Sequence, residues 1–258
     1  MAYNMGSSIM RSHGEKLVNQ GTSKILACLD ISRLKTYFAV DNSYVLYKLR
    51  LILLPFRHAK WERSQDDPGG IGSGGPGIGR SPSDHALYKP PRLDVNAPDL
   101  YIPSMGFITY ILIFAYALGV DNRFNPEVLS LSASWAMLTL FLEILVLYGG
   151  FWFLNVEPSR RPYLLELLAY CSYKFVGIIL AILSGLMFGH ATYYCVTVLF
   201  GSTMGIFLMK SLAYVTTTYD SSAPQRRYFL AIMGLMQVFY AWFLSSSALP
   251  TISSVETS

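Results

Sequence analysis

The sequence predicts an all-α polytopic membrane protein, with about five transmembrane helices in a compact bundle. Two observations predict this fold class. Hydrophobic residues make up 52% of the 258 residues and charged residues only 14%, well below the roughly 25% charged residues typical of soluble domains. The charges are also unevenly spread, because thirteen of the twenty lysines and arginines precede residue 100. A basic, soluble N-terminal region, residues 1–66, is therefore expected before the membrane part.

The N-terminal region is expected to stay in the cytosol. Residues 1–20 are mostly polar and have no apolar core of about 7–15 residues, so the first transmembrane helix is expected to direct membrane entry. Further on, basic residues between Lys48 and Arg63 flank the apolar run from Leu51 to Phe56, which is too short to span a bilayer. This segment can lie on an anionic membrane surface, or it can form a small core helix of a cytosolic domain.

Residues 67–99 are predicted to be a flexible linker. Seven glycines and three prolines fall within residues 67–83, which leaves little apolar surface to offset the entropy of ordering. A glycine-rich phosphate-binding loop is disfavoured here, because no Lys-Ser or Lys-Thr pair follows and no strand precedes the glycines.

Five apolar segments fill residues 100–250, and each is near the roughly 20 residues that a spanning helix needs. They cover residues 100–120, 129–154, 163–188, 193–214 and 228–249. Their short connections predict an up-and-down bundle. Apart from Arg123 and the intramembrane Lys174, the lysines and arginines fall on the side of the N-terminus. The N-terminus is therefore expected in the cytosol and the tail, residues 251–258, in the lumen.

Glu143 and Lys174 lie deep in the second and third segments, where an unpaired charge is unfavourable. The midpoint between them falls beside Pro158, near the centre of the connecting loop. In an antiparallel hairpin with a rise of about 1.5 Å per residue, they reach similar depths. We therefore predict an intramembrane pair. Its role is either to stabilise the fold or to form part of a pathway for protons or ions. Alternatively, Lys174 extends toward the cytosolic headgroups.

Small residues at every fourth position predict a ridge on which helices pack closely. In the third segment they are Gly177, Ala181, Gly185 and Gly189, and in the fourth segment Gly201 and Gly205 repeat the spacing. Such a ridge can serve packing within one chain or between chains.

Known catalytic and ligand-binding patterns are missing from the sequence. It contains no Gly-x-Ser-x-Gly, no His-Glu-x-x-His, no cysteine pair with metal-ligand spacing and no nucleotide loop. We expect a protein that is not an enzyme and has no cofactor, no metal and no nucleic-acid partner. The cysteines Cys28, Cys171 and Cys195 indicate no disulfide framework. Cys171 is expected to be a buried thiol, with palmitoylation as the alternative.

Residues 90–103, PPRLDVNAPDLYIP, form the most distinctive segment. Its prolines disfavour a helix before the first span, and Ser104 is expected to cap the helix that follows. The acidic and aromatic residues between the prolines need another explanation. Together with five further segments, this run resembles the Yif (Yip-interacting factor) family. These segments are residues 37–41 (YFAVD), 107–119 (FITY and ALG at its ends), 123–129 (RFNPEVL), 170–177 (YCSYKFVG) and 185–189 (GLMFG).

Residues 99–103 also resemble the Asp-Leu-Tyr-Gly-Pro signature of the wider Yip superfamily, with Ile102 in place of the glycine. On this resemblance, the candidates for partner binding are Asp94, Asn96, Pro98, Asp99, Leu100, Tyr101 and Pro103.

The resemblance implies a multi-spanning protein of the early secretory pathway. Proteins of this family cycle between the endoplasmic reticulum and the Golgi, enter coat-protein-II vesicles, associate with Yip proteins and bind Rab/Ypt GTPases through cytosolic regions. We therefore expect a membrane adaptor in transport between these compartments, with Yip-type proteins, Rab/Ypt GTPases, vesicle coat components and membrane lipids as partners. The alternative is a small transporter or channel using Glu143 and Lys174, which five spans without an obvious inverted repeat disfavour.

Overall fold

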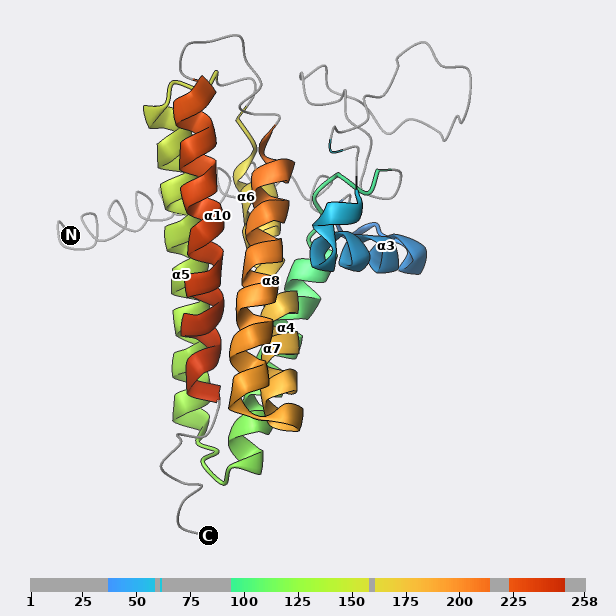
Figure 1. The fold of residues 1–258 in the computed structure, drawn as a ribbon, viewed down its shortest axis with the longest axis vertical. Helices are drawn as coiled ribbons and strands as arrows, with labels where there is room; N and C mark the ends of the chain where they lie inside the picture. Colours follow the sequence, from blue (N-terminus) through green and yellow to red (C-terminus); the bar gives the residue numbers. More distant parts are fainter. Residues whose placement is uncertain (1–36, 59–60, 62–93, 158–160, 214–222, 249–258) are drawn as a thin grey trace, which may run out of the picture. The chain divides into compact units, whose positions relative to one another are not determined.

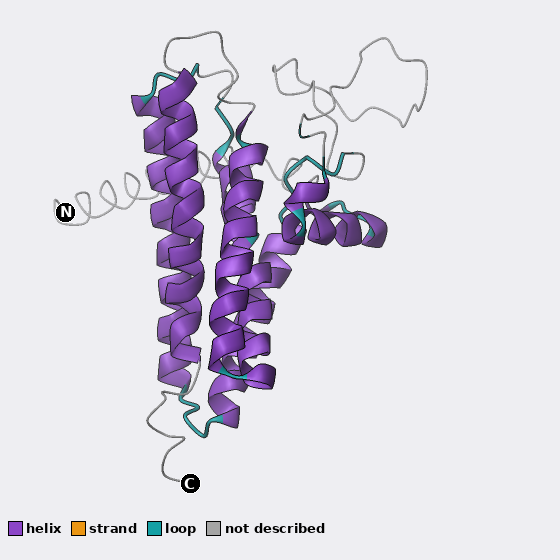
Figure 2. Cartoon of the chain, in the orientation of Figure 1, coloured by secondary structure: helices purple, strands orange, loops and turns teal. Residues whose placement is uncertain are grey.

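The computed structural model describes residues 37–58, 61, 94–157, 161–213 and 223–248. The chain divides into two compact units, residues 1–39 and 40–258, and only residues 37–39 of the first unit are described. Every regular element in the described part of the second unit is a helix (Figure 2). Residues 67–93 of the predicted linker at 67–99 and the tail at 251–258 lie outside the described residues, as does most of the N-terminal region. The end of the predicted linker, residues 94–99, is described, and most of it is buried.

Within the described residues, five helical segments are long and apolar enough to cross a membrane, which confirms the predicted all-α polytopic class (Figure 1). In chain order they are α4 (Tyr101–Val120), α5 (Pro126–Phe153), α6 (Leu164–Ser172) with α7 (Lys174–Phe188), α8 (His190–Ser211), and α10 (Ala223–Ser245) with the 3-10 turn η4 (Ser246–Ala248). Before them come α3 (Asn42–Leu53) and the 3-10 turn η1 (Pro55–Arg57). Figure 1 shows α3 lying crosswise to the long helices.

The second span begins three residues earlier than the apolar pattern predicts. The side chain of Asn125 accepts a hydrogen bond from the Glu127 N–H at 2.9 Å, and Pro126 occupies the first helical position. Asparagine at the N-cap followed by proline is a favoured helix start. The capping residues therefore set this boundary, and hydrophobicity alone does not reveal it.

The first span is not capped by Ser104, contrary to the prediction. Ser104 lies inside α4, and its hydroxyl donates to the Leu100 carbonyl oxygen at 2.7 Å. The free backbone donor at the start of the helix is satisfied by Asp99 instead, whose Oδ1 accepts from the Ile102 N–H at 2.9 Å. A carboxylate is the stronger acceptor at this position, because it also interacts favourably with the positive end of the helix dipole.

The fifth span begins about five residues before the predicted one. Its first turn contains Arg226, which is buried and donates to the carbonyl oxygens of Leu154 and Asn155, each at 3.3 Å. These carbonyls lie at the end of α5, where the last carbonyls of a helix have no partners within it. Arg226 therefore belongs to the first turn of α10 and satisfies the last carbonyls of α5. The apolar pattern alone places it in the loop before the fifth span.

The third span is interrupted at Tyr173, between α6 and α7. The Ser172 hydroxyl donates to the Leu168 carbonyl oxygen at 2.6 Å, and the Val176 N–H donates to the Tyr173 carbonyl oxygen at 3.1 Å, three residues back. Serine bonds of this kind often bend helices, and a bond three residues back tightens the turn. Two consecutive side chains, Tyr173 and Lys174, leave this tightened turn.

Close packing joins α8 to both α7 and α10. A Cβ placed on Gly205 would lie 2.3 Å from the Gly234 carbonyl oxygen, and one on Gly201 would lie 2.8 Å from Val238 Cα. On the α7 side, a Cβ on Gly177 would lie 3.0 Å from Phe200 Cβ. These three predicted glycines therefore contact helices of the same chain.

The remaining members of the predicted ridge take different positions. Ala181 is buried against Tyr193 of α8, and Gly185 is buried within α7. Gly189 does not lie on the ridge: its φ of 85° ends α7, and its N–H donates to the Gly185 carbonyl oxygen at 2.9 Å. Glycine adopts this positive φ without strain, because it has no Cβ.

Candidate functional site

Asp99 is the centre of a buried polar cluster just before the first span. Its side chain is fully buried. Besides capping α4, it accepts hydrogen bonds through Oδ2 from the Tyr173 hydroxyl at 2.6 Å and from the Tyr44 hydroxyl at 3.2 Å. Tyr44 comes from α3 and Tyr173 from the interruption of the third span. One carboxylate therefore joins three separate parts of the second unit.

Lys48 of α3 is fully buried against the segment that precedes the first span. Its ammonium group donates to the Val95 carbonyl oxygen at 2.6 Å and to the Ala97 carbonyl oxygen at 2.9 Å. The ammonium also lies 5.4 Å from the ring centre of Tyr173 and 5.8 Å from that of Phe207, within the range of cation–π attraction. A buried charge needs such partners to remain stable. We call Tyr44, Lys48, Ala97, Asp99 and Tyr173 the Asp99 cluster.

The Asp99 cluster favours the protonated form of the Tyr44 phenol. Burial raises the pKa of the Tyr44 phenol well above its usual value, and the nearby Asp99 carboxylate raises it further. Tyr44 therefore stays a protonated donor at neutral pH, and it also donates to the Ala97 carbonyl oxygen at 3.0 Å.

Most of the predicted partner-binding residues lie inside this contact region. Asp94, Pro98, Asp99, Leu100 and Pro103 are buried, Asn96 is half-buried, and Tyr101 is exposed. Asn96 contacts His58 Nε2 through its Oδ1 at 3.0 Å. With α3 docked, the segment holds elements of its own chain together, and Tyr101 is the member that offers the most surface.

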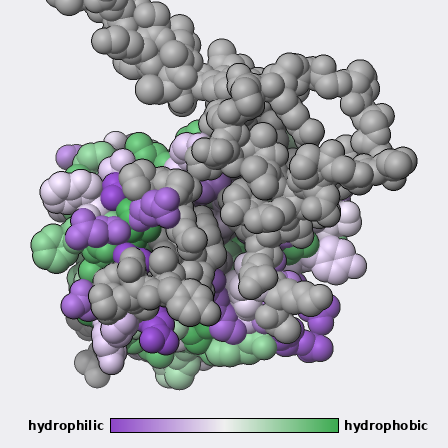
Figure 3. Space-filling view, turned by 90° about the horizontal axis from the view of Figure 1, so that it is seen from above, coloured by the Kyte–Doolittle hydropathy of each residue, from purple (hydrophilic) through white to green (hydrophobic). Residues whose placement is uncertain are grey.

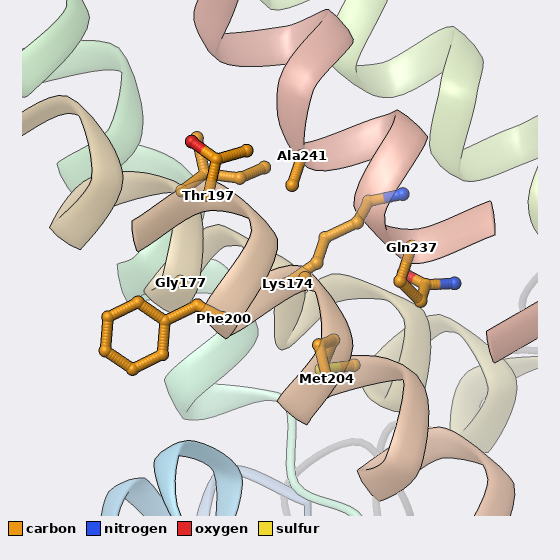
Figure 4. Close-up of a pocket in the computed structure, with 9 residues that line it drawn as sticks. Lys174, Gly177, Thr197, Phe200, Met204, Gln237 and Ala241 are labelled. Carbon is orange, nitrogen blue, oxygen red and sulfur yellow. The ribbon is translucent and has the colours of Figure 1, made fainter. Parts of the chain in front are cut away.

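A second buried polar cluster lies within the membrane-spanning helices. The structure brings Glu143 of α5 and Lys174 of α7 together, with Lys174 Nζ 2.5 Å from Glu143 Oε2. Gln237 of α10 donates from Nε2 to Glu143 Oε1 at 2.5 Å, and the Lys174 ammonium lies 4.7 Å from the ring centre of Tyr240. We call these four residues the Glu143 cluster. Figure 4 shows the Lys174 side chain extending from α7 toward α10.

A small cavity adjoins the Glu143 cluster between α7, α8 and α10. It has about 10 Å³ of room for a water-sized sphere, and its lining includes Lys174, Thr197 and Gln237 (Figure 4). Among the described residues, no group donates a hydrogen bond to the buried Oε1 atom of Gln237. A space of this size suits about one water molecule, and it is far below the usual size of a ligand pocket.

The chemistry of the described residues is that of structural contacts. Within them, no group of three or more His, Cys, Asp or Glu residues could hold a metal ion. Cys171 is a buried free thiol, as expected, while Cys195 is exposed. Both carboxylate–lysine clusters are closed, with each charge facing groups of the same chain.

Comparison with known proteins decides the family. The model of the YIF1 family matches residues 1–245. The chain belongs to the YIF1 family. The Yif resemblance of the sequence motifs is thereby confirmed.

Relatives in the YIF1 family come from animals and yeasts. Protein YIF1A of Mus musculus is 37% identical over 230 residues, which cover 88% of this chain and 70% of the relative. Protein YIF1B of Danio rerio is 37% identical, with 82% of this chain and 61% of the relative covered. "Protein transport protein yif1" of Schizosaccharomyces pombe is 33% identical, with 95% and 81% covered. The matched part thus spans about three fifths to four fifths of the length of these relatives. No solved structure matches this YIF1-family chain.

Sequence patterns missed several residues of both clusters in this YIF1-family protein. Tyr44 and Lys48 were not expected to be buried, because a basic residue on a polar helix usually faces solvent. Gln237 carried a usable signal, since it is a polar residue in the middle of an apolar span, where polar side chains bond across helices.

Proposed function

We propose that this YIF1-family chain is a non-enzymatic membrane adaptor in vesicle-mediated protein transport between the endoplasmic reticulum and the Golgi. Relatives from two yeasts carry the name "protein transport protein", which supports the transport role. The observation that carries the proposal is the closed packing of the bundle. Its buried charges face polar groups of the same chain, and its surface is left to meet other proteins and lipids.

The proposed orientation places the N-terminus in the cytosol and the C-terminus in the lumen. Lys210 lies in the last turn of α8 and Arg226 in the first turn of α10, so both belong to the same end of the bundle. Arg123 follows α4 at the other end and pairs with Asp121. The excess of basic residues at one end supports a cytosolic location for that end. Glycosylation acceptor sites test this topology: a site after Ser258 is expected to be modified and one near Gly6 is not, and the reverse pattern contradicts it.

We infer separate surfaces for the two kinds of protein partner. Yip-type proteins would contact the outer faces of the spanning helices, because the glycine ridge of α7 is covered by α8. Rab/Ypt GTPases and vesicle coat components would meet the cytosolic N-terminal region and the loops at that end. Seen from above, the described part of this end carries hydrophilic side chains among hydrophobic ones (Figure 3), as expected of a surface at the membrane boundary.

Crosslinked purification of the tagged full-length chain tests the proposal. Both Yip-type proteins and a Rab/Ypt GTPase are expected in the purified material. Deleting residues 1–66 is expected to abolish GTPase recovery while Yip recovery persists. Because that deletion also removes Tyr44 and Lys48, the matched control deletes residues 1–36 and leaves the Asp99 cluster intact. If neither partner is recovered with the intact chain, the adaptor role is wrong.

The rival function, a transporter or channel using Glu143 and Lys174, makes a different prediction. Solute flux through reconstituted vesicles that is lost on neutralising Glu143 would favour it. The direct pairing of Lys174 with Glu143, the bond from Gln237 and the small adjoining cavity support the adaptor instead.

A further inference from the structure

Helix α3 carries large apolar side chains on both its buried face and its exposed face. The buried face contains Tyr44 and Lys48 of the Asp99 cluster together with Leu51 and Ile52. The outward face leaves large hydrophobic side chains uncovered: Leu46 is 69% exposed, Tyr47 64% and Phe56, just after the helix, 64%. Arg50 and Arg57 lie exposed among them. We call Leu46, Tyr47, Arg50, Leu54, Phe56 and Arg57 the outer face of α3.

The contacts of α3 fix its level relative to the spanning helices. Tyr44 and Lys48 bind Ala97 and Asp99, which come directly before α4 begins at Tyr101. On its other side, Lys48 contacts Phe207, which lies one turn before α8 ends at Ser211. The end of one candidate span and the start of another therefore flank α3, which places it at the boundary of the membrane.

The picture of the fold agrees with this level. In Figure 1, α3 lies crosswise beside the N-terminal end of α4, and the upper ends of α5 and α10 extend beyond it. A helix at the tip of the bundle would instead lie beyond all of the helix ends. Helix α3 thus lies beside the bundle and not beyond its tip, at the level where the headgroups of the surrounding lipid begin.

We propose that the outer face of α3 lies in the headgroup layer of the membrane that the bundle spans, with Arg50 and Arg57 on anionic lipid headgroups. Within the described residues, neither arginine has an ion pair, so both are free to bind lipid phosphates or carboxylates. Tyrosine and phenylalanine suit the interfacial layer, and a helix in the plane of the interface binds by buried apolar area together with its basic residues.

Lipid suits this face better than a protein partner does. The hydrophobic and basic side chains are mixed along one helix, as expected for a boundary between acyl chains and charged headgroups. Each arginine near an anionic surface is expected to strengthen the contact about fivefold.

Depth measurements by electron paramagnetic resonance test the proposal in the full-length chain. A nitroxide is attached to Tyr47→Cys in a background with Cys28, Cys171 and Cys195 replaced by alanine, and the protein is placed in nanodiscs of neutral lipid or of neutral lipid with phosphatidylserine. Collisions with oxygen, which concentrates in the bilayer, are compared with collisions with a water-soluble nickel chelate. Labels at Phe141→Cys, outward in the middle of α5, and at Glu127→Cys, exposed at its start, give the lipid and water references.

The proposal expects the label at residue 47 to favour oxygen over nickel severalfold more than the label at residue 127 does, and more strongly in anionic than in neutral discs. The double variant Arg50→Gln with Arg57→Gln should lose the difference between the two lipids, and Arg50→Lys with Arg57→Lys should keep it. Size-exclusion profiles check that each variant is folded. If the label at residue 47 collides with the nickel chelate as often as the label at residue 127 does, the proposal is wrong. The outer face of α3 would then be a contact surface for a protein. Equal depth in both lipids overturns the role of the arginines.

Discussion

The Asp99 cluster and the Glu143 cluster both bury a carboxylate and a lysine, but they satisfy these charges in different ways. In the Glu143 cluster the ammonium binds the carboxylate directly. In the Asp99 cluster Lys48 binds backbone carbonyls, while Asp99 binds two tyrosine hydroxyls and the start of α4. The difference follows from what each cluster joins. Between regular helices the backbone groups are already bonded, so a buried charge pairs with an opposite charge. The irregular segment before α4 has free backbone groups, and these serve as partners.

The two clusters also meet at consecutive residues of the third span. Tyr173 belongs to the Asp99 cluster and Lys174 to the Glu143 cluster, and both follow the tightened turn between α6 and α7. Adjacent helical residues point about 100° apart, so one turn supplies a side chain to each cluster. The docking of α3 at the membrane boundary is therefore linked through a single turn to the polar contacts in the middle of the bundle.

Removing the carboxylate of the Asp99 cluster is expected to have the largest effect. Asp99→Ala leaves the Ile102 N–H without its cap and two buried hydroxyls with fewer acceptors. Loss of the cap and of buried hydrogen bonds together is expected to lower the free energy of unfolding by about 3–5 kcal/mol. Unfolding in mixed micelles with increasing denaturing detergent measures this. Asp121→Ala, which breaks a surface pair with Arg123, is the matched control and should change it by less than about 1 kcal/mol. Equal losses for the two variants would contradict the central role of Asp99.

Close packing, rather than either polar cluster, is expected to join α8 to α10. Gly205→Leu forces a side chain against the Gly234 backbone, and overpacking of this kind is expected to lower the free energy of unfolding by about 3 kcal/mol. The same change at Gly149, where a Cβ would have no neighbour within 4 Å, should be nearly neutral. Detergent unfolding of both variants measures the difference. If Gly149→Leu is as harmful as Gly205→Leu, the loss is not specific to the close contact between Gly205 and Gly234.

The pair in the Glu143 cluster is expected to show coupling. Glu143→Leu or Lys174→Leu alone leaves a buried charge without its partner, and intramembrane polar contacts are typically worth about 0.6–2 kcal/mol. Each single change should lower the yield of folded protein, and the double change should recover part of it, as measured by a double-mutant cycle. Gln237→Leu should couple to Glu143 in the same way. Strictly additive losses would mean that the observed contacts contribute no net stability.

The sequence predicts the spans and the residues of the intramembrane pair, because hydrophobicity and hairpin symmetry are local or nearly local signals. Glu143 and Lys174 stand out as charges in apolar segments. The Asp99 cluster was not predictable in this way, since Tyr44 and Lys48 contact residues 95–99 across 47 to 55 positions of the sequence, which include the glycine-rich stretch at 67–83. The spacing of apolar residues indicates local structure only, and it does not predict contacts between such distant segments. The family motif marked the right segment, but it did not reveal that most of its residues face the inside of the protein.

The smallest expected effect concerns the hydroxyl of Tyr44 and its dependence on pH. Tyr44→Phe removes two hydrogen bonds, to Ala97 and Asp99, while Tyr173 still donates to Asp99. The loss in the free energy of unfolding at pH 8 is expected to be about 1 kcal/mol. The exposed Tyr47 supplies the control, because Tyr47→Phe should change nothing.

The pH dependence separates the Tyr44 hydroxyl from simple packing. In the folded protein burial and Asp99 raise the pKa of Tyr44, whereas in the unfolded chain a tyrosine ionises near pH 10. The stability from neutral Tyr44 is therefore complete below about pH 10 and is lost as the pH rises further, because ionisation then favours the unfolded state. The native protein should lose this contribution and Tyr44→Phe should not, so the gap between their unfolding midpoints should narrow between about pH 10 and 11. A gap that stays constant or widens over this range would mean that folding does not raise the pKa of Tyr44, and that its hydroxyl is not held against Asp99 in the folded protein.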